Sequence, residues 1–235
     1  MCMSNHIEIF QSYNTLVAND IYTRKSGASN ILFIGGCRSF VYAIFFEELC
    51  KYDSWFNNAQ FGIAAIAVHI IDLHKRDKTK NIKNVIENAD IIICEQIRHY
   101  SFLNTSKNCE INLFNSFELK KNCKVIQIPN LELQYNIENN ISDSIKNQNL
   151  SRFVEHCDKY SCNVISEYVI QNINKSSLFV TYNHPNSNLV LELFKRIIEL
   201  TFDRQITDLN ILNLLHLCTF KTPIFIQYNY LLKMT

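Results

Sequence analysis

The sequence has only four glycines and three prolines, and it lacks several motifs that identify common catalytic sites. No P-loop, complete Gly-X-Gly-X-X-Gly, His-Glu-X-X-His or Gly-X-Ser-X-Gly motif is present. These absences remove the usual sequence signals for nucleotide, zinc-protease and serine-hydrolase sites. The chain also lacks an excess of either charge, since it contains 23 Lys and Arg and 22 Asp and Glu. We therefore expect no nucleic acid or anionic membrane surface as a partner.

The nine cysteines include no Cys-X-X-Cys pair. The closest two, Cys157 and Cys162, lack the spacing of a zinc knuckle, so we expect no metal. Residues 1–10 lack the pattern of a signal peptide, and the longest apolar stretch, 61–73, is too short to span a bilayer. We therefore expect a cytoplasmic protein with reduced thiols, most of them buried as small apolar side chains.

Short apolar runs alternate with helical patterns along the chain. Residues 31–34 form a continuous apolar run, which is typical of a strand buried on both faces of a parallel sheet. Further strand candidates occur at 61–71, 89–94, 124–128 and 177–182. Helical patterns occur at 39–49 with Ser39 as the N-cap, and at 77–88, 113–120, 150–173, 188–200 and 208–218. We therefore expect one α/β domain over 1–235, with a doubly wound, mostly parallel, flavodoxin-like sheet flanked by helices and with extra C-terminal helices.

Three segments fall outside this alternation. Residues 20–29 are polar and are expected to form a loop. Residues 131–149 have no clear period and are expected to be an insertion or a loop over the site. Residues 201–235 are expected to form a helical appendage. Its last apolar segment, 223–232, is either an edge strand or a contact to a further domain or a second copy of the chain.

Polar or reactive side chains follow three of the predicted strands, at 36–38, 96–100 and 183–185. Ligands bind at the carboxyl ends of the strands in doubly wound sheets. Cys37 is the strongest candidate, because two glycines before it allow a tight turn and close approach of a ligand. The helix that follows supplies amide donors and a dipole that stabilise a thiolate or an oxyanion. The alternative is an inert cysteine packed under the turn.

His184 is the natural base for this thiol, and its alternative is a loop histidine bonded to a carbonyl. Gln96 could donate its amide to an oxyanion or a substrate carbonyl, or it could face water. Arginine and lysine side chains near strand ends could hold phosphates, or they could be solvated surface charges. The predicted ligand-binding set is Gly36, Arg38, Lys75, Arg76, Arg98, His99, Tyr100 and Asn183.

Four segments occur in the order found in a known family. Residues 31–38, 89–96, 128–130 and 181–185 resemble the WcbI-type polysaccharide biosynthesis enzymes, a family assigned to acetyl transfer in capsular polysaccharide assembly. The likeness covers most of residues 31–200. It implies a fold related to the SGNH-type hydrolases and binding of coenzyme A or acetyl-CoA.

The resemblance also implies roles for individual residues. The family's cysteine, its glutamine after the third strand and its His-Pro histidine correspond to Cys37, Gln96 and His184. The family usually has Asn-Cys-Gln at the turn, where this chain has Gly36-Cys37-Arg38. If the missing amides orient the acyl group, Arg38 or another residue must replace them.

The resulting expectation is an acetyl-CoA-dependent acetyltransferase acting on a sugar or sugar nucleotide. Either Cys37 takes the acetyl group as a thioester, or His184 activates the acceptor for direct attack on acetyl-CoA and Cys37 only shapes the pocket. The alternatives are an esterase or thioesterase on the same scaffold, and a non-catalytic module that binds coenzyme A or a nucleotide.

Overall fold

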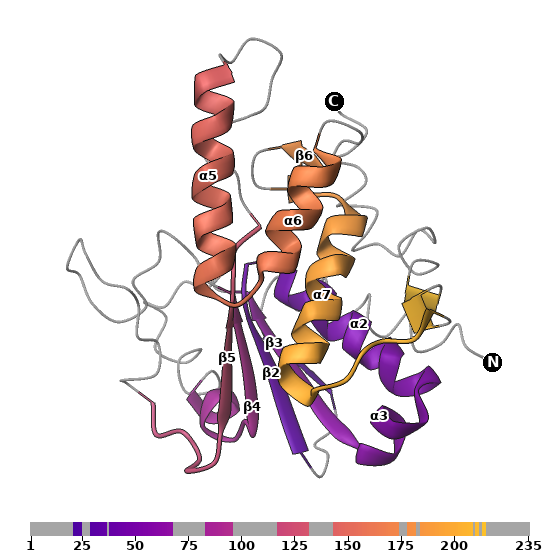
Figure 1. The fold of residues 1–235 in the computed structure, drawn as a ribbon. Helices are drawn as coiled ribbons and strands as arrows, with labels where there is room; N and C mark the ends of the chain where they lie inside the picture. The colour runs from indigo at the N-terminus through magenta and orange to yellow at the C-terminus, as the bar shows by residue number, and fades with distance from the viewer. Residues whose placement is uncertain are drawn as a thin grey trace. The chain divides into compact units, whose positions relative to one another are not determined.

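The computed structural model describes residues 21–24, 29–36, 38–67, 83–95, 117–131, 143–173, 178–181, 184–208, 210–211 and 213–214 (Figure 1). The chain divides into two compact units, Met1–Gln127 and Ile128–Thr235. The expectation of a single domain stays a prediction.

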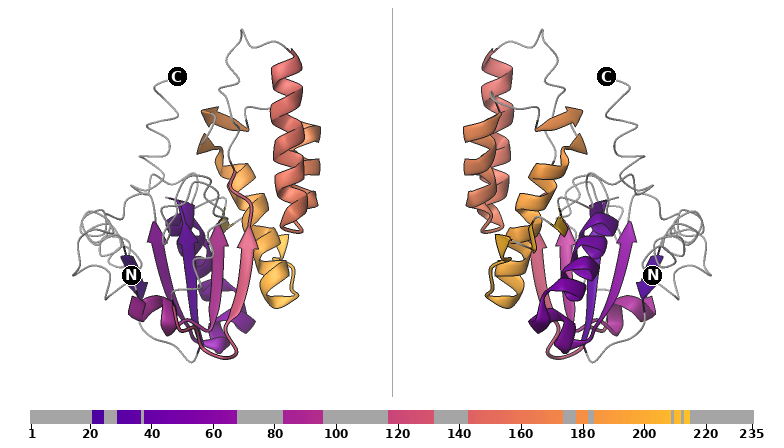
Figure 2. Two further views of the ribbon diagram at one scale, coloured as in Figure 1. Left: turned by 90° about the vertical axis from the view of Figure 1, so that its left-hand side faces the viewer. Right: turned by 90° about the vertical axis from the view of Figure 1, so that its right-hand side faces the viewer.

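A five-stranded sheet with the order β1-β3-β2-β4-β5 forms the centre of the first unit (Figures 1 and 2). The strands are β1 (Ile21–Arg24), β2 (Ser29–Gly35), β3 (Phe61–Ala67), β4 (Ile91–Glu95) and β5 (Lys124–Ile128). Strands β2 to β5 run parallel, and β1 lies antiparallel to β3 at one edge. The predicted α/β fold with a mostly parallel sheet is confirmed.

The central strand β2 lies between β3 and β4. The chain passes from β2 to β3 on one side and then crosses to β4 on the other side, so the strand order reverses between β2 and β4. Residues 31–34 of β2 are almost fully buried, as expected for a strand that is covered on both faces. The carboxyl ends of β2 and β4 therefore flank the topological switch point, where doubly wound sheets bind ligands.

One face of the sheet is covered by α2 (Arg38–Tyr52) and α3 (Ser54–Ala59). Aromatic rings make this contact, with Phe46 at their centre. Its ring centroid lies 5.9 Å from that of Phe33 in β2, 5.2 Å from that of Phe61 in β3 and 5.6 Å from that of Phe56 in α3. Phe46 is fully buried, so it joins both helices to the sheet.

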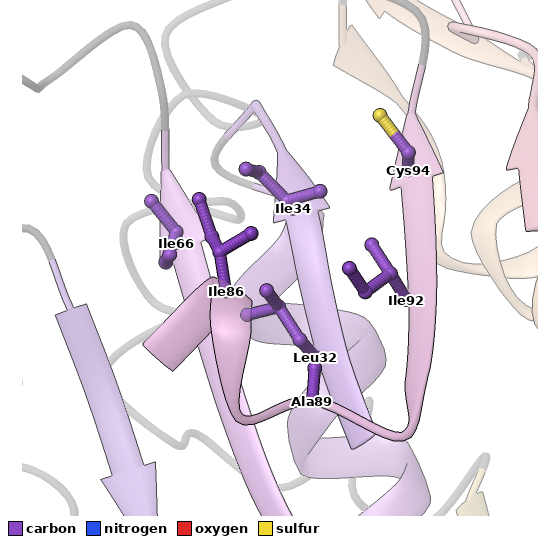
Figure 3. Packing of buried hydrophobic residues seen from close by; sticks show 7 residues of the cluster. All are labelled: Leu32, Ile34, Ile66, Ile86, Ala89, Ile92 and Cys94. Atoms are coloured by element: carbon purple, nitrogen blue, oxygen red, sulfur yellow. The ribbon is translucent and has the colours of Figure 1, made fainter. Parts of the chain in front are cut away.

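Aliphatic side chains cover the opposite face. Because side chains alternate along a strand, Leu32 and Ile34 point away from the Phe33 side. They pack with side chains from β3, β4 and the segment 83–89 into the cluster drawn in Figure 3, which comprises Leu32, Ile34, Ile66, Ile86, Ala89, Ile92 and Cys94. The described part of the predicted helix 77–88 is helical at 83–87.

Three local predictions in this unit are wrong. The predicted loop 20–29 contains β1, whose backbone groups pair with the edge of β3. Ser39 is not an N-cap, since α2 begins at Arg38 and the Ser39 hydroxyl instead lies against two carbonyl oxygens. Residues 117–120 of the predicted helix 113–120 are not helical. There Lys120 forms an ion pair with Asp90.

Three long helices make up most of the described part of the second unit: α5 (Asp143–Lys159), α6 (Asn163–Asn172) and α7 (Ser187–Phe202). In Figure 1, α6 runs back alongside α5. The Asn186 side chain caps α7 by accepting the Leu189 N–H at 2.9 Å. The predicted helix 188–200 is confirmed, as are the described residues of 208–218. Within the described part of the chain, no helix combines the length and the apolar character needed to cross a bilayer.

Three predictions in the second unit need correction. The predicted helix 150–173 is broken at 160–162, where Ser161 has a φ of 55°. The predicted loop 131–149 already contains the first turns of α5. The predicted fifth strand exists as β6 (Phe179–Thr181), but it pairs antiparallel with β7 (His184–Pro185) in a separate two-stranded sheet.

Candidate functional site

The Glu95 side chain links the carboxyl ends of β2 and β4. Its Oε2 accepts the Gly36 N–H at 3.0 Å, and its Oε1 accepts the Arg38 Nε–H at 2.7 Å. The Arg38 and Glu95 side chains are only 7% and 1% exposed. A single buried carboxylate therefore holds the residues on both sides of position 37.

Gly35 leaves the space that this carboxylate occupies. A Cβ at position 35 would lie 2.6 Å from the Glu95 Cβ and 2.9 Å from its Oε2, closer than real Cβ atoms approach. Among the described glycines none has a positive φ, so Gly35 is required for space and not for an unusual backbone angle. The two glycines in the sequence predict the close approach of a ligand to the backbone. At Gly35 the group that approaches closely is instead the Glu95 side chain.

The first turn of α2 is tied to both neighbouring strands. The Gly36 carbonyl accepts the Ser39 N–H at 3.0 Å. The Ser39 Oγ lies 2.8 Å from the same carbonyl oxygen and 3.0 Å from the Ile66 carbonyl oxygen of β3, so its single proton is shared between two acceptors. The amino end of α2, with its amide donors, is thus held at the switch point, directly after position 37.

The structure describes only part of the predicted site. Gly36 directly follows β2, Arg38 begins α2, and His184 lies in β7. The other predicted site residues lie outside the described residues: Cys37, Lys75, Arg76, Gln96, Arg98, His99, Tyr100 and Asn183. Their roles, and the grouping of Cys37 with Gln96 and His184, stay predictions.

His184 is paired opposite Thr181 in the two-stranded sheet of the second unit. The sequence predicts that His184 follows the carboxyl end of a strand in the main sheet. That strand is β6, and it is not hydrogen-bonded into the main sheet. The strand-end argument therefore does not link His184 to the ends of β2 and β4. Its predicted role as a base rests on the family resemblance.

Arg38 was predicted to be a phosphate ligand, and Glu95 was not among the predicted site residues. The Arg38 side chain is buried and its Nε is bonded to Glu95, so at least this donor is used within the protein. A role of Arg38 toward the phosphates of coenzyme A stays a prediction. One sequence signal could have identified Glu95: it is a charged residue at the end of a fully apolar strand.

A pocket of about 370 Å³ opens at the opposite end of the sheet, near the amino ends of β2 and β3. Apolar side chains and three asparagines line it: Asn30, Ile31, Leu32, Gly62, Ile63, Ala64, Asn84, Val85, Asn88 and Ala89. Because doubly wound sheets bind ligands at the carboxyl ends of their strands, we do not include this pocket in the candidate site.

The described cysteines are free thiols, and three of them, Cys94, Cys157 and Cys162, are buried. Burial and the neighbouring Glu95 charge raise the pKa of Cys94 to about 12. Burial raises the pKa of Cys162 to about 11 and that of Cys157 further still. These thiols are therefore not nucleophiles at neutral pH. In the described part of the chain, no cluster of three or more His, Cys, Asp or Glu side chains could hold a metal.

The buried thiols predict a loss of stability at alkaline pH. Their pKa values are higher in the folded than in the unfolded state, so above about pH 9 the unfolded chain binds fewer protons and unfolding becomes more favourable. Each thiol contributes a slope of up to about 1.4 kcal/mol per pH unit. Urea unfolding in reducing buffer between pH 8.5 and 10.5 measures this slope. Cys94→Ala should make it shallower, and an unchanged slope would contradict the assignment.

Comparisons with known proteins found neither a protein-family model nor a curated protein that matches this chain.

Proposed function

We propose that the protein is an acetyl-CoA-dependent acetyltransferase that acts on a sugar or sugar nucleotide in glycan biosynthesis. The observation that supports this proposal is the strand order, which reverses between β2 and β4. Cys37 follows β2 by two residues, and Gln96 follows β4 directly. The thiol and the amide that the family resemblance selects thus come from the two strands that flank the switch point.

The start of α2 at Arg38 supports the same assignment. A cysteine that precedes a helix amino terminus lies near unpaired amide donors and the positive end of the helix dipole. These groups lower the energy of a thiolate. They also stabilise the negative charge that develops on the carbonyl oxygen during acyl transfer.

The covalent route has two balanced steps. His184 takes the proton of the Cys37 thiol, the sulfur attacks the acetyl carbonyl carbon, and the bond from that carbon to the coenzyme A sulfur breaks. Coenzyme A then leaves as a thiol with the proton from His184. In the second step His184 takes the proton of the acceptor hydroxyl or amine, the acetyl group moves to the acceptor, and the Cys37 thiol is restored.

In the direct route His184 deprotonates the acceptor, which attacks acetyl-CoA itself, and coenzyme A leaves with that proton. Cys37 then only shapes the pocket. Peptide mass spectrometry after mixing with acetyl-CoA and an acid quench separates the routes. An acetyl adduct on Cys37 supports the covalent route, and its absence in the presence of acetyl transfer supports the direct route. Cys50→Ala is the matched control, because Cys50 is a half-buried cysteine of α2.

Turnover with a panel of UDP- and GDP-sugars tests the function itself. We expect His184→Ala to lower kcat by about 10²–10⁴-fold, the usual contribution of a general base. Acetate release without any acceptor would instead indicate a thioesterase. No turnover, together with a higher melting temperature in coenzyme A, would indicate a binding module.

A further inference from the structure

We propose that the pocket at the amino ends of β2 and β3 is a second binding site, which takes a small uncharged ligand with a flat, nucleobase-like ring. The pocket lies at the opposite end of the sheet from the candidate site for acyl transfer, and its described lining includes no residue assigned to that site. The inference therefore goes beyond the proposed function and does not depend on it.

The pocket exists because two residues of β3 are too small to fill the space above them. Side chains alternate along a strand, so Gly62, Ala64 and Ile66 face the same side of the sheet. Ile66 fills its position and belongs with Ile86 to the aliphatic cluster of Figure 3. Gly62 and Ala64 follow toward the amino end and, together with the segment 84–89, line a hollow of about 370 Å³. This volume lies in the range of small-molecule sites, about 300–1,000 Å³.

The described lining consists of apolar groups and asparagines and carries no charged side chain. The charged neighbours of this lining form ion pairs with one another, Lys83 with Glu87 and Asp90 with Lys120. An ionic ligand would lose hydration here without gaining a partner of opposite charge, so the pocket favours an uncharged ligand. A glycine inside a strand lets a ligand approach the backbone closely, and a flat ring can lie over such a surface.

Three asparagines form a hydrogen-bonded rim on this pocket. The Asn30 Nδ2 donates to the Asn88 carbonyl oxygen at 3.4 Å. The Asn88 Nδ2 donates to the carbonyl oxygen and to the Oδ1 of Asn84, both at 2.8 Å. In the described part of the chain, the Oδ1 atoms of Asn30 and Asn88 and the Nδ2 of Asn84 make no hydrogen bond. The rim therefore offers acceptors and a donor side by side, which match a ring edge that carries an amino group beside a carbonyl group or a ring nitrogen.

Asp90 fixes this rim to the sheet. Its Oδ2 accepts the Asn30 N–H at 2.7 Å, and its own N–H donates to the Asn30 carbonyl oxygen at 2.8 Å. Its Oδ1 is bonded to the Lys120 Nζ at 2.7 Å. The backbone that carries the Asn30 side chain is thus held on both sides, which reduces the cost of ordering the site when a ligand binds.

The test is a titration of the full chain with cytosine, nicotinamide and nicotinate, followed in two-dimensional proton–nitrogen NMR spectra. The side-chain NH₂ signals of Asn84 and Asn88 are assigned by their loss in Asn84→Ala and Asn88→Ala. Cytosine and nicotinamide should shift these signals. Nicotinate has the ring of nicotinamide with a carboxylate in place of the amide, so it should bind about fivefold or more weakly. A nicotinate that binds as tightly as nicotinamide would contradict the assignment of an uncharged ligand.

Variants of the lining locate the bound probe. Ala64→Leu fills the pocket, so it should raise the Kd by about tenfold or more, and a filled cavity should keep or raise the stability. Asn84→Ala and Asn88→Ala should each raise the Kd by about 2–10-fold, the effect of one hydrogen bond. Both side chains are exposed, so these variants keep the test decisive if Ala64→Leu does not fold. Asn57→Ala is the matched control, because Asn57 is an exposed asparagine of α3 outside the described lining, and it should leave the Kd unchanged.

Two results would overturn the proposal. One is that neither cytosine nor nicotinamide shifts the two signals at up to about 10 mM, a range that covers weak binding of ligands of this size. The other is that both probes bind Ala64→Leu as tightly as wild type, which would place them outside the pocket. The titration needs no acetyl-CoA, so its failure leaves the proposed function standing, and an absence of acetyl transfer leaves this binding site standing.

Discussion

Arg38→Met is expected to lower the free energy of unfolding by about 3–5 kcal/mol, because it leaves the Glu95 carboxylate buried without its ion-pair partner. Methionine fills much of the same volume, so a cavity adds little to the loss. Urea unfolding at pH 7, followed by far-UV circular dichroism, measures it. The double variant Arg38→Met, Glu95→Leu should recover much of the loss, since apolar side chains can replace a buried ion pair at little cost.

Lys120→Met is the matched control for this experiment. The ion pair between Lys120 and Asp90 has the same N–O distance of 2.7 Å, but its side chains are 39% and 34% exposed. An exposed pair contributes about 0–1 kcal/mol, so this variant should lose little stability. If Arg38→Met and Lys120→Met cost the same, the Arg38–Glu95 pair is not the buried linkage that the structure indicates.

Phe46→Ala is expected to lower the free energy of unfolding by about 3–5 kcal/mol, the usual cost of removing a fully buried phenylalanine ring. Phe46 contacts rings from β2, β3 and α3, so its loss opens a cavity where both helices join the sheet. The same urea experiment measures the loss. Phe46→Leu keeps most of the apolar volume and should cost less than about 1.5 kcal/mol. A loss below that value for Phe46→Ala would show that this contact does not anchor the helices.

The central strands could be predicted because their signal is local. Residues 31–34 are a continuous apolar run and residues 124–128 are a short segment of strand length stopped by Pro129, and both lie in strands of the sheet. The edge strand β1 has no such signal, since its pairing is with β3, some 40 residues further along the chain. The β6 segment shows the converse problem. Its apolar residues give the same sequence pattern whether the segment joins the large sheet or a separate hairpin.

The Glu95 linkage could not be predicted for a related reason. Arg38 and Glu95 are 57 residues apart, and they meet because β2 and β4 pair in a register that sets Ile34 opposite Cys94. No periodicity in the sequence defines that register. The sequence did identify the strand, the turn and the helix around position 37, because each depends on neighbouring residues. Cys37 and Gln96 lie outside the described residues. Their relation to one another and to His184 therefore stays a prediction from the family resemblance.

The space at Gly35 has a consequence for how this sequence can vary. Any side chain at position 35 would collide with Glu95, and a change at position 95 would leave Arg38 without its carboxylate. Substitutions at positions 35, 38 and 95 are therefore coupled. A single replacement at one of them should destabilise the fold, whereas a joint replacement can avoid this loss of stability. In sequences that keep this turn, we expect the three positions to covary as one unit although 60 residues separate the first from the last.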